Sequence, residues 1–234
     1  MSQNFEVESP IINSPFVEPG LHWVIEKAMP PRKAEGRRRA SYFYRVPEHA
    51  GRGRKSKATA DMFAAEKGEE VDLALVNEIR TRVKNWRKGI HGAGLAYDGA
   101  SSVTKELLEL WRGEERMQRL FFAQIEAVET ILFLIEASEI YRKGLPEIPK
   151  DEPGLDAKAA GFRTFVRYSC KMATGSGKTT VMGMLAAWSI LNRVAASTDD
   201  RFSDTILIVC PNFTIRESSS AISSLSNGNS SVCR

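Results

Sequence analysis

The sequence contains few residues of the types that build disulfide frameworks or metal centres. Its 234 residues include three cysteines and three histidines. Cys170, Cys210 and Cys233 are odd in number and widely spaced, which predicts reduced, partly buried thiols rather than disulfides or a zinc site. The histidines have no cysteine or carboxylate at ligand spacing, so no protein-held metal centre is predicted.

Long hydrophobic runs are also absent. No stretch of about 18 uninterrupted apolar residues occurs, which argues against a membrane-spanning helix. The first ten residues carry Glu6 and Glu8 and lack the basic flank and apolar core of a secretory signal. We therefore expect a cytoplasmic protein with no membrane partner.

Positive charge is modest in total but unevenly distributed. The net charge is +4, yet between residues 32 and 57 only two glutamates oppose a large excess of arginine and lysine. This segment could follow a nucleic-acid backbone, with the aromatic residues at 42–44 stacking on bases. It could equally be a solvated basic loop around a short strand at 41–46 whose aromatic side chains pack inward. The candidate phosphate contacts are Arg37, Arg38 and Arg39.

Helical patterns dominate the middle of the chain. An apolar stripe with a spacing of four residues predicts a core-facing helix that ends near Gly89. Two further helices are predicted at 103–112, capped by Ser101 or Ser102, and at 116–141. The proline- and glycine-rich residues 141–162 predict a long loop. The stripe consists of Val71, Leu75, Ile79 and Val83.

The most informative pattern begins at residue 164. A short β-branched and aromatic run at 164–170 is followed by a glycine-rich loop, an apolar helix from 178 to 194, and a second buried run at 204–210. Strand, loop, helix and strand in this order predict a right-handed crossover unit of a parallel sheet. The predicted fold class is α/β.

The loop "KMATGSGKTT", residues 171–180, has the composition of a phosphate-binding loop. Gly175 and Gly177 permit the backbone angles and the close approach that phosphate requires. Lys178 can reach the β- and γ-phosphates, and the Thr179 hydroxyl can bind Mg²⁺. The strict motif begins with glycine six residues before the lysine, where this sequence has Met172.

The form "ATGSGKT" resembles motif I of superfamily-two helicases and translocases. Upstream, "LFFAQIEAVETILFLIEA" at 120–137 resembles the glutamine-bearing adenine-recognition segment of the same group. The resemblance implies an incomplete RecA-like P-loop domain that binds ATP and Mg²⁺, and the amide of Gln124 would contact the adenine edge. The nucleotide-binding residues carried over are Gln124, Thr174, Gly175, Ser176, Gly177, Lys178 and Thr179.

Downstream, "ILIVCPNFTIRE" at 206–217 resembles motif Ia, which touches the nucleic-acid backbone. Pro211, Asn212 and Thr214 are its candidate contacts. Together with "INSPFVEPGLHWVIE" at 12–26, these motifs look most similar to the N-terminal part of a bacterial restriction helicase of the type III Res-subunit kind. DNA and a restriction-modification partner subunit are the partners that this resemblance implies.

A helicase of that family also needs a DEAH-like acidic motif after the loop and a second lobe. The sequence contains neither, because the acidic run at 151–154 precedes the loop and lies in a proline-rich stretch. We therefore expect an ATP-binding fragment that does not hydrolyse ATP alone. The alternatives are a basic nucleic-acid-binding or interaction module with a vestigial loop and, third, a complete small P-loop kinase or ATPase.

These patterns predict four regions along the chain. They are a basic irregular arm over 1–60, a helical N-terminal region over 61–115, a partial RecA-like ATP-binding lobe over 116–217, and a disordered Ser-rich tail over 218–234.

Overall fold

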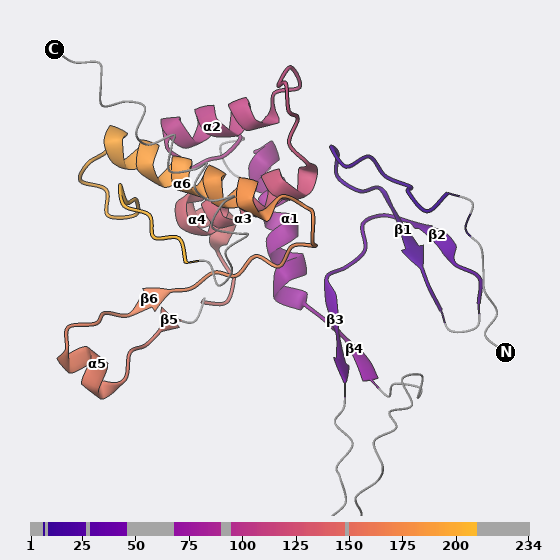
Figure 1. The fold of residues 1–234 in the computed structure, drawn as a ribbon, viewed down its shortest axis with the longest axis horizontal. Helices are drawn as coiled ribbons and strands as arrows, with labels where there is room; N and C mark the ends of the chain where they lie inside the picture. The colour runs from indigo at the N-terminus through magenta and orange to yellow at the C-terminus, as the bar shows by residue number, and fades with distance from the viewer. Residues whose placement is uncertain are drawn as a thin grey trace, which may run out of the picture.

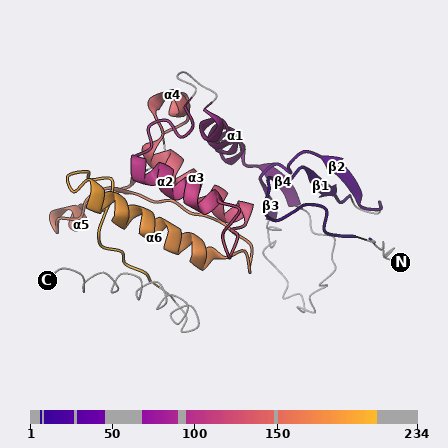
Figure 2. The same ribbon diagram turned by 90° about the horizontal axis from the view of Figure 1, so that it is seen from above.

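The computed structural model describes residues 7, 9–26, 29–45, 68–89, 95–147 and 150–209. This part of the chain combines helices with small antiparallel sheets, each of two strands. Figures 1 and 2 show α1, α2, α3, α4 and α6 gathered in one body, with the β1–β2 and β3–β4 ribbons on one side of it, and Figure 1 shows the β5–β6 ribbon projecting from it with α5 at its far end. The elements are β1 Leu21–Val24, β2 Arg32–Glu35, β3 Ser41–Arg45, β4 Gly68–Asp72, α1 Ala74–Lys88, α2 Ser102–Arg112, α3 Phe122–Glu136, α4 Glu139–Arg142, β5 Lys150–Asp151, α5 Leu155–Ala159, β6 Phe165–Val166 and α6 Lys178–Ala195.

The helix α3 forms the centre of the body and packs against α1, α2 and α6. Its sequence is apolar on nearly every side, as a helix surrounded by others requires. Val128, Leu132 and Phe133 are fully buried on it. Burial of each such side chain stabilises the fold by roughly 1.5–3 kcal/mol.

A buried carboxylate on α3 joins it to α1 and α2. Glu129 is inaccessible to solvent and accepts hydrogen bonds from Arg87 at 2.6 Å, from Arg112 at 3.0 Å and from the hydroxyl of Tyr97 at 2.6 Å. Burial raises the pKa of Tyr97, and the charge of Glu129 raises it further. Two guanidinium groups therefore satisfy the carboxylate that α3 brings into the core.

A second buried carboxylate fixes α6 on the body. Glu136 of α3 accepts hydrogen bonds from Trp188 of α6 at 2.8 Å and from Thr104 of α2 at 2.8 Å. Asn192, one turn beyond Trp188, donates to the Thr104 hydroxyl at 3.1 Å. Because every partner is buried, this network specifies where α6 lies. The loop that opens α6 is positioned with it.

Several predicted elements are confirmed. The strand predicted at 41–46 is β3, and the predicted helix at 103–112 is α2, whose cap is Ser101, accepting from the Thr104 amide at 3.0 Å. The apolar helix predicted after the loop is α6. The β1–β2 hairpin at the start of the chain was not predicted.

Other boundaries differ from the predicted ones. The helix expected over 116–141 is interrupted, since α3 ends at Glu136 and α4 begins only at Glu139. Val71 of the predicted stripe lies in β4, whereas Val83 is fully buried on α1 as expected. The expected long loop at 141–162 contains β5 and α5.

The predicted parallel pairing is absent from the described residues. Of the run at 164–170 only β6 is a strand, and it pairs antiparallel with β5, Lys150 opposite Val166. Residues 204–209 form no strand. Parallel strands are usually stable only within a larger sheet that is covered on both faces, and the described residues supply no such sheet.

Candidate nucleotide-binding site

The glycine-rich loop has the backbone conformation that phosphate binding requires. Gly175 and Gly177 have φ angles of 79° and 81°, in the left-handed region that glycine adopts at little cost. Ser176 closes the turn between them, since its hydroxyl donates to the Ala173 carbonyl at 2.7 Å. The loop therefore holds a defined turn at the entrance to α6.

The N-terminus of α6 is open to an anion. Gly177 is its cap residue, no side chain accepts a hydrogen bond from the first-turn amides, and the first turn carries no acidic residue. The amides and the partial positive charge of a helix of 18 residues thus face the loop. This arrangement suits phosphate.

Lys178 lies at the mouth of the loop and is exposed. Its ammonium group donates to the carbonyl oxygens of Met172 at 3.1 Å and Ala173 at 2.8 Å. Carbonyl oxygens are weaker partners for an ammonium group than phosphate oxygens are, so the lysine can exchange them for a phosphate. Thr179 is half-buried in the first turn of α6, where its hydroxyl would have to bind Mg²⁺.

The structure brings Gln124 next to the loop, although the two are far apart in the sequence. Gln124 is buried in the first turn of α3, and its Oε1 accepts from the Phe121 amide at 2.8 Å. A Cβ atom on Gly177 would lie 1.9 Å from its Nε2. Gln124 and Gly177 therefore fit together only because residue 177 has no side chain.

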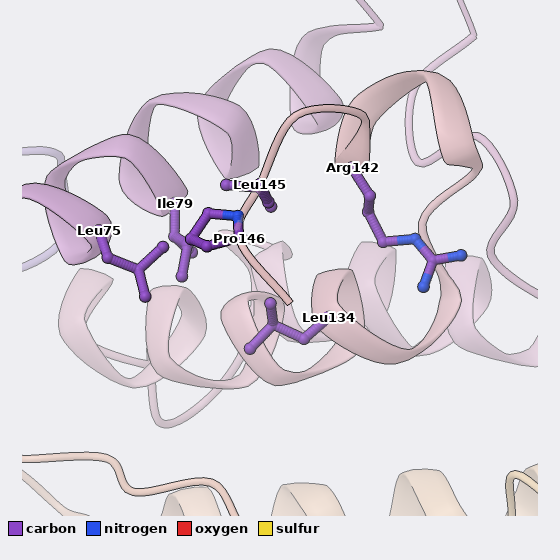
Figure 3. A pocket seen from close by; sticks show the side chains of 6 residues that line it. All are labelled: Leu75, Ile79, Leu134, Arg142, Leu145 and Pro146. Atoms are coloured by element: carbon purple, nitrogen blue, oxygen red, sulfur yellow. The ribbon is translucent and has the colours of Figure 1, made fainter. Parts of the chain in front are cut away.

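A cavity of about 410 Å³ adjoins the loop. It lies between α1, α3 and residues 168–176, and Met172, Ala173 and Ser176 of the loop segment line it. A smaller hollow of about 210 Å³ continues along α1 and α3, with Ile79 and Leu134 common to both. Figure 3 shows this smaller hollow with Leu134 facing the side chains of α1.

Charged and aromatic groups stand at the larger cavity. Arg37 pairs with Glu126 through two hydrogen bonds of 2.5 and 2.6 Å, which raise the pKa of Arg37. Arg80 has no ion-pair partner among the described residues, and burial, with the nearby Arg37 charge, lowers its pKa. Burial raises the pKa of Tyr168. Sequence reasoning missed Arg80 and Tyr168, because nothing in their local pattern indicates that α1 and residue 168 meet.

The three arginines predicted to contact nucleic acid are each ion-paired. Arg37 is held on α3, whereas Arg38 pairs with Glu70 at 3.2 Å and Arg39 with Asp72 at 2.7 Å across the β3–β4 ribbon. The Arg38 and Arg39 side chains remain 65% and 71% exposed. These two can therefore still reach a ligand, but only in competition with carboxylates.

The remaining predicted residues divide between described and undescribed parts of the chain. Pro211, Asn212 and Thr214 lie outside the described residues, as do Cys210 and Cys233. Cys170 is a free thiol that is exposed rather than partly buried. Thr174 lies in the turn before Gly175 and is exposed.

Within the described ranges, no group of three or more His, Cys, Asp or Glu side chains could hold a metal ion. The same residues include no helix with the length and hydrophobicity that crossing a bilayer demands. Comparisons with protein-family models, with curated proteins and with solved structures find no match.

Proposed function

We propose that the chain binds ATP with Mg²⁺ through the loop at 173–179, as the ATP-binding part of a DNA helicase or translocase of the restriction-modification type. The observation that carries the proposal is the left-handed pair Gly175 and Gly177 at the uncapped start of α6, with the Lys178 ammonium group at the mouth. Backbone amides, a helix dipole and a mobile cation converge there. In this site the Thr179 hydroxyl holds Mg²⁺, and the ion neutralises phosphate charge.

The helicase part of the proposal rests on the resemblance of the motifs. A RecA-like arrangement would place 164–170 and 204–210 as parallel strands beside the loop, which differs from the antiparallel β5–β6 pair of the described residues. The packing of α3 on α6 puts Gln124 against Gly177, so the two segments that carry the motifs lie together, as the resemblance requires; the described strands do not show the parallel pairing. The proposal for these residues concerns ATP binding, because the groups brought together here are those that hold phosphate and Mg²⁺.

Binding of a fluorescent ATP analogue with Mg²⁺ tests the proposal. Lys178→Ala should lower the affinity for the analogue at least about tenfold, because the positive charge that contacts the phosphates is lost. Lys105→Ala, which removes an exposed lysine from α2, is the matched control and should bind as the wild type does. Equal binding by wild type and Lys178→Ala would contradict the proposal.

A second candidate function is nucleic-acid backbone binding by the β3–β4 ribbon. Arg38 and Arg39 are exposed just before β3, where they pair with carboxylates of β4, and the β3 residues Tyr42 and Phe43 are 43% and 52% exposed. Exposed aromatic rings and arginines are the groups that contact single strands without sequence preference. This function is independent of the loop and would survive Lys178→Ala.

A further inference from the structure

The cavity beside the loop is placed to receive the rest of any ligand whose phosphates the loop holds. Met172, Ala173 and Ser176 belong to the loop segment and also line the cavity. The volume of about 410 Å³ lies within the range of small-molecule sites, roughly 300–1,000 Å³. The cavity and the loop therefore adjoin at these three residues, within reach of a ligand that extends from the loop.

Much of the cavity lining is apolar. Ile79 of α1, Ala127 and Ile131 of α3 and Met172 of the loop segment contribute to it. An apolar surface of this kind suits the face of a heterocyclic base. The same apolar side chains cannot form hydrogen bonds with a phosphate group or with sugar hydroxyls.

The polar groups at the cavity are those that a nucleoside can use. Arg80 lines the cavity and forms no ion pair with a carboxylate among the described residues. Its planar guanidinium group can stack on a purine ring. The Thr130 hydroxyl donates to the Glu126 carbonyl at 2.7 Å, which leaves its oxygen free to accept. Tyr168, on the segment that leads to the loop, also lines the cavity.

The side chain of Gln124 makes its contacts outside the cavity. Its Oε1 caps α3 through the Phe121 amide, and its Nε2 lies against Gly177. It does not line the cavity. These contacts make it a link between α3 and the loop, so its effect on a ligand passes through Gly177.

We propose that the cavity between α1, α3 and residues 168–176 holds the nucleoside part of the nucleoside triphosphate, and that Gln124 is a positioning residue for the loop. This inference rests on the proposed function, because it takes the phosphates to lie in the loop. It places the base on Ile79, Ala127 and Ile131 and assigns Arg80 to the ring face.

The test compares two ligands by calorimetry on the full chain with Mg²⁺. ATP carries a nucleoside, and inorganic tripolyphosphate does not. Val76→Trp on α1 and Ala123→Trp on α3 each add bulk to an exposed position that lines the cavity. Leu110→Trp is the matched control, since Leu110 is 58% exposed and does not line it.

The cavity variants should lower ATP affinity about tenfold and change tripolyphosphate affinity by less than about twofold, since only the nucleoside loses its contacts. Leu110→Trp should leave both unchanged. Gln124→Ala should weaken both ligands by the same factor, because it disturbs the loop they share. Thermal melting of each variant confirms that it is folded.

Two results would overturn this inference alone. The first is that both tryptophan variants bind ATP as the wild type does, while binding of both ligands still depends on Lys178. The second is that Gln124→Ala weakens ATP but not tripolyphosphate, which would place the base against Gln124. If neither ligand binds the wild type, the proposed function itself fails.

Discussion

At the scale of single residues, Gly177 is where the loop and α3 come closest. Gly177→Ala places a side chain at a φ of 81° and drives its Cβ into the Gln124 amide. Gly175→Ala also places a side chain at a positive φ, which costs roughly 1–2 kcal/mol, but its Cβ would contact no other atom. We expect Gly177→Ala to destabilise the fold by about 1 kcal/mol more than Gly175→Ala, as measured by urea unfolding, since the α3 cap must also break. Equal losses would mean that Gln124 moves aside freely.

Glu129 is a buried charge whose loss should have a large energetic effect. Glu129→Gln leaves the guanidinium groups of Arg87 and Arg112, which are 16% and 32% exposed, without this opposing charge, and should cost up to about 3–5 kcal/mol. Urea unfolding measures the loss. Glu114→Gln is the control, because Glu114 is 81% exposed in its pair with Arg119 and should change stability by less than about 1 kcal/mol. A small effect at Glu129 would show that water reaches the site.

At the scale of elements, the carboxylates of β4 would compete with DNA for Arg38 and Arg39 if the proposed nucleic-acid binding occurs there. A hydrogen bond from Arg39 lowers the pKa of Asp72. Hydrogen bonds from Ser41 and from Arg38 lower the pKa of Glu70. Substituting Asp72→Asn and Glu70→Gln together should release both arginines and tighten DNA binding. The slope of log affinity against log salt should steepen by up to about 1.8, because each phosphate that a released arginine neutralises adds about 0.9.

Fluorescence anisotropy with a DNA duplex, titrated at several salt concentrations, measures that slope. Arg38→Gln with Arg39→Gln should change it in the opposite direction. Glu152→Gln removes an exposed carboxylate from a pair with Lys158 outside the ribbon and is the control. An unchanged slope in all variants would remove the ribbon as a DNA-binding surface.

Elements with a strong local signal were the ones that sequence reasoning predicted well. The capped helix α2, the strand β3 and the helix α6 with its loop each depend on neighbouring residues, and each was found. The resemblance of two motifs assigned Gln124 and the loop to one nucleotide site, but it did not predict the direct approach of Gln124 to Gly177. The cavity wall at Arg80 and Tyr168 depends on how distant elements pack, which no local pattern encodes.

At the scale of the whole molecule, two β-prone segments remain uncovered. Phe165 and Val166 are 53% and 40% exposed, and Leu207 and Val209 are 87% and 80% exposed. Sequence patterns predicted these runs as buried parallel strands, because β-branched and apolar residues are typical of covered sheets. In the described residues neither run has a sheet neighbour on both sides, so its side chains face solvent. Such a surface favours self-association.

The stability of Leu207→Ser distinguishes this exposed arrangement from a RecA-like one. If residue 207 faces solvent, the substitution removes no buried contact, so the free energy of unfolding should change by less than about 0.5 kcal/mol. Light scattering should then show weaker self-association. Leu132→Ala is the reference for a buried leucine and should cost about 2–5 kcal/mol. A loss at Leu207 close to that of Leu132 would instead indicate that 204–209 is buried as a sheet strand in solution, because only a covered side chain can contribute that much.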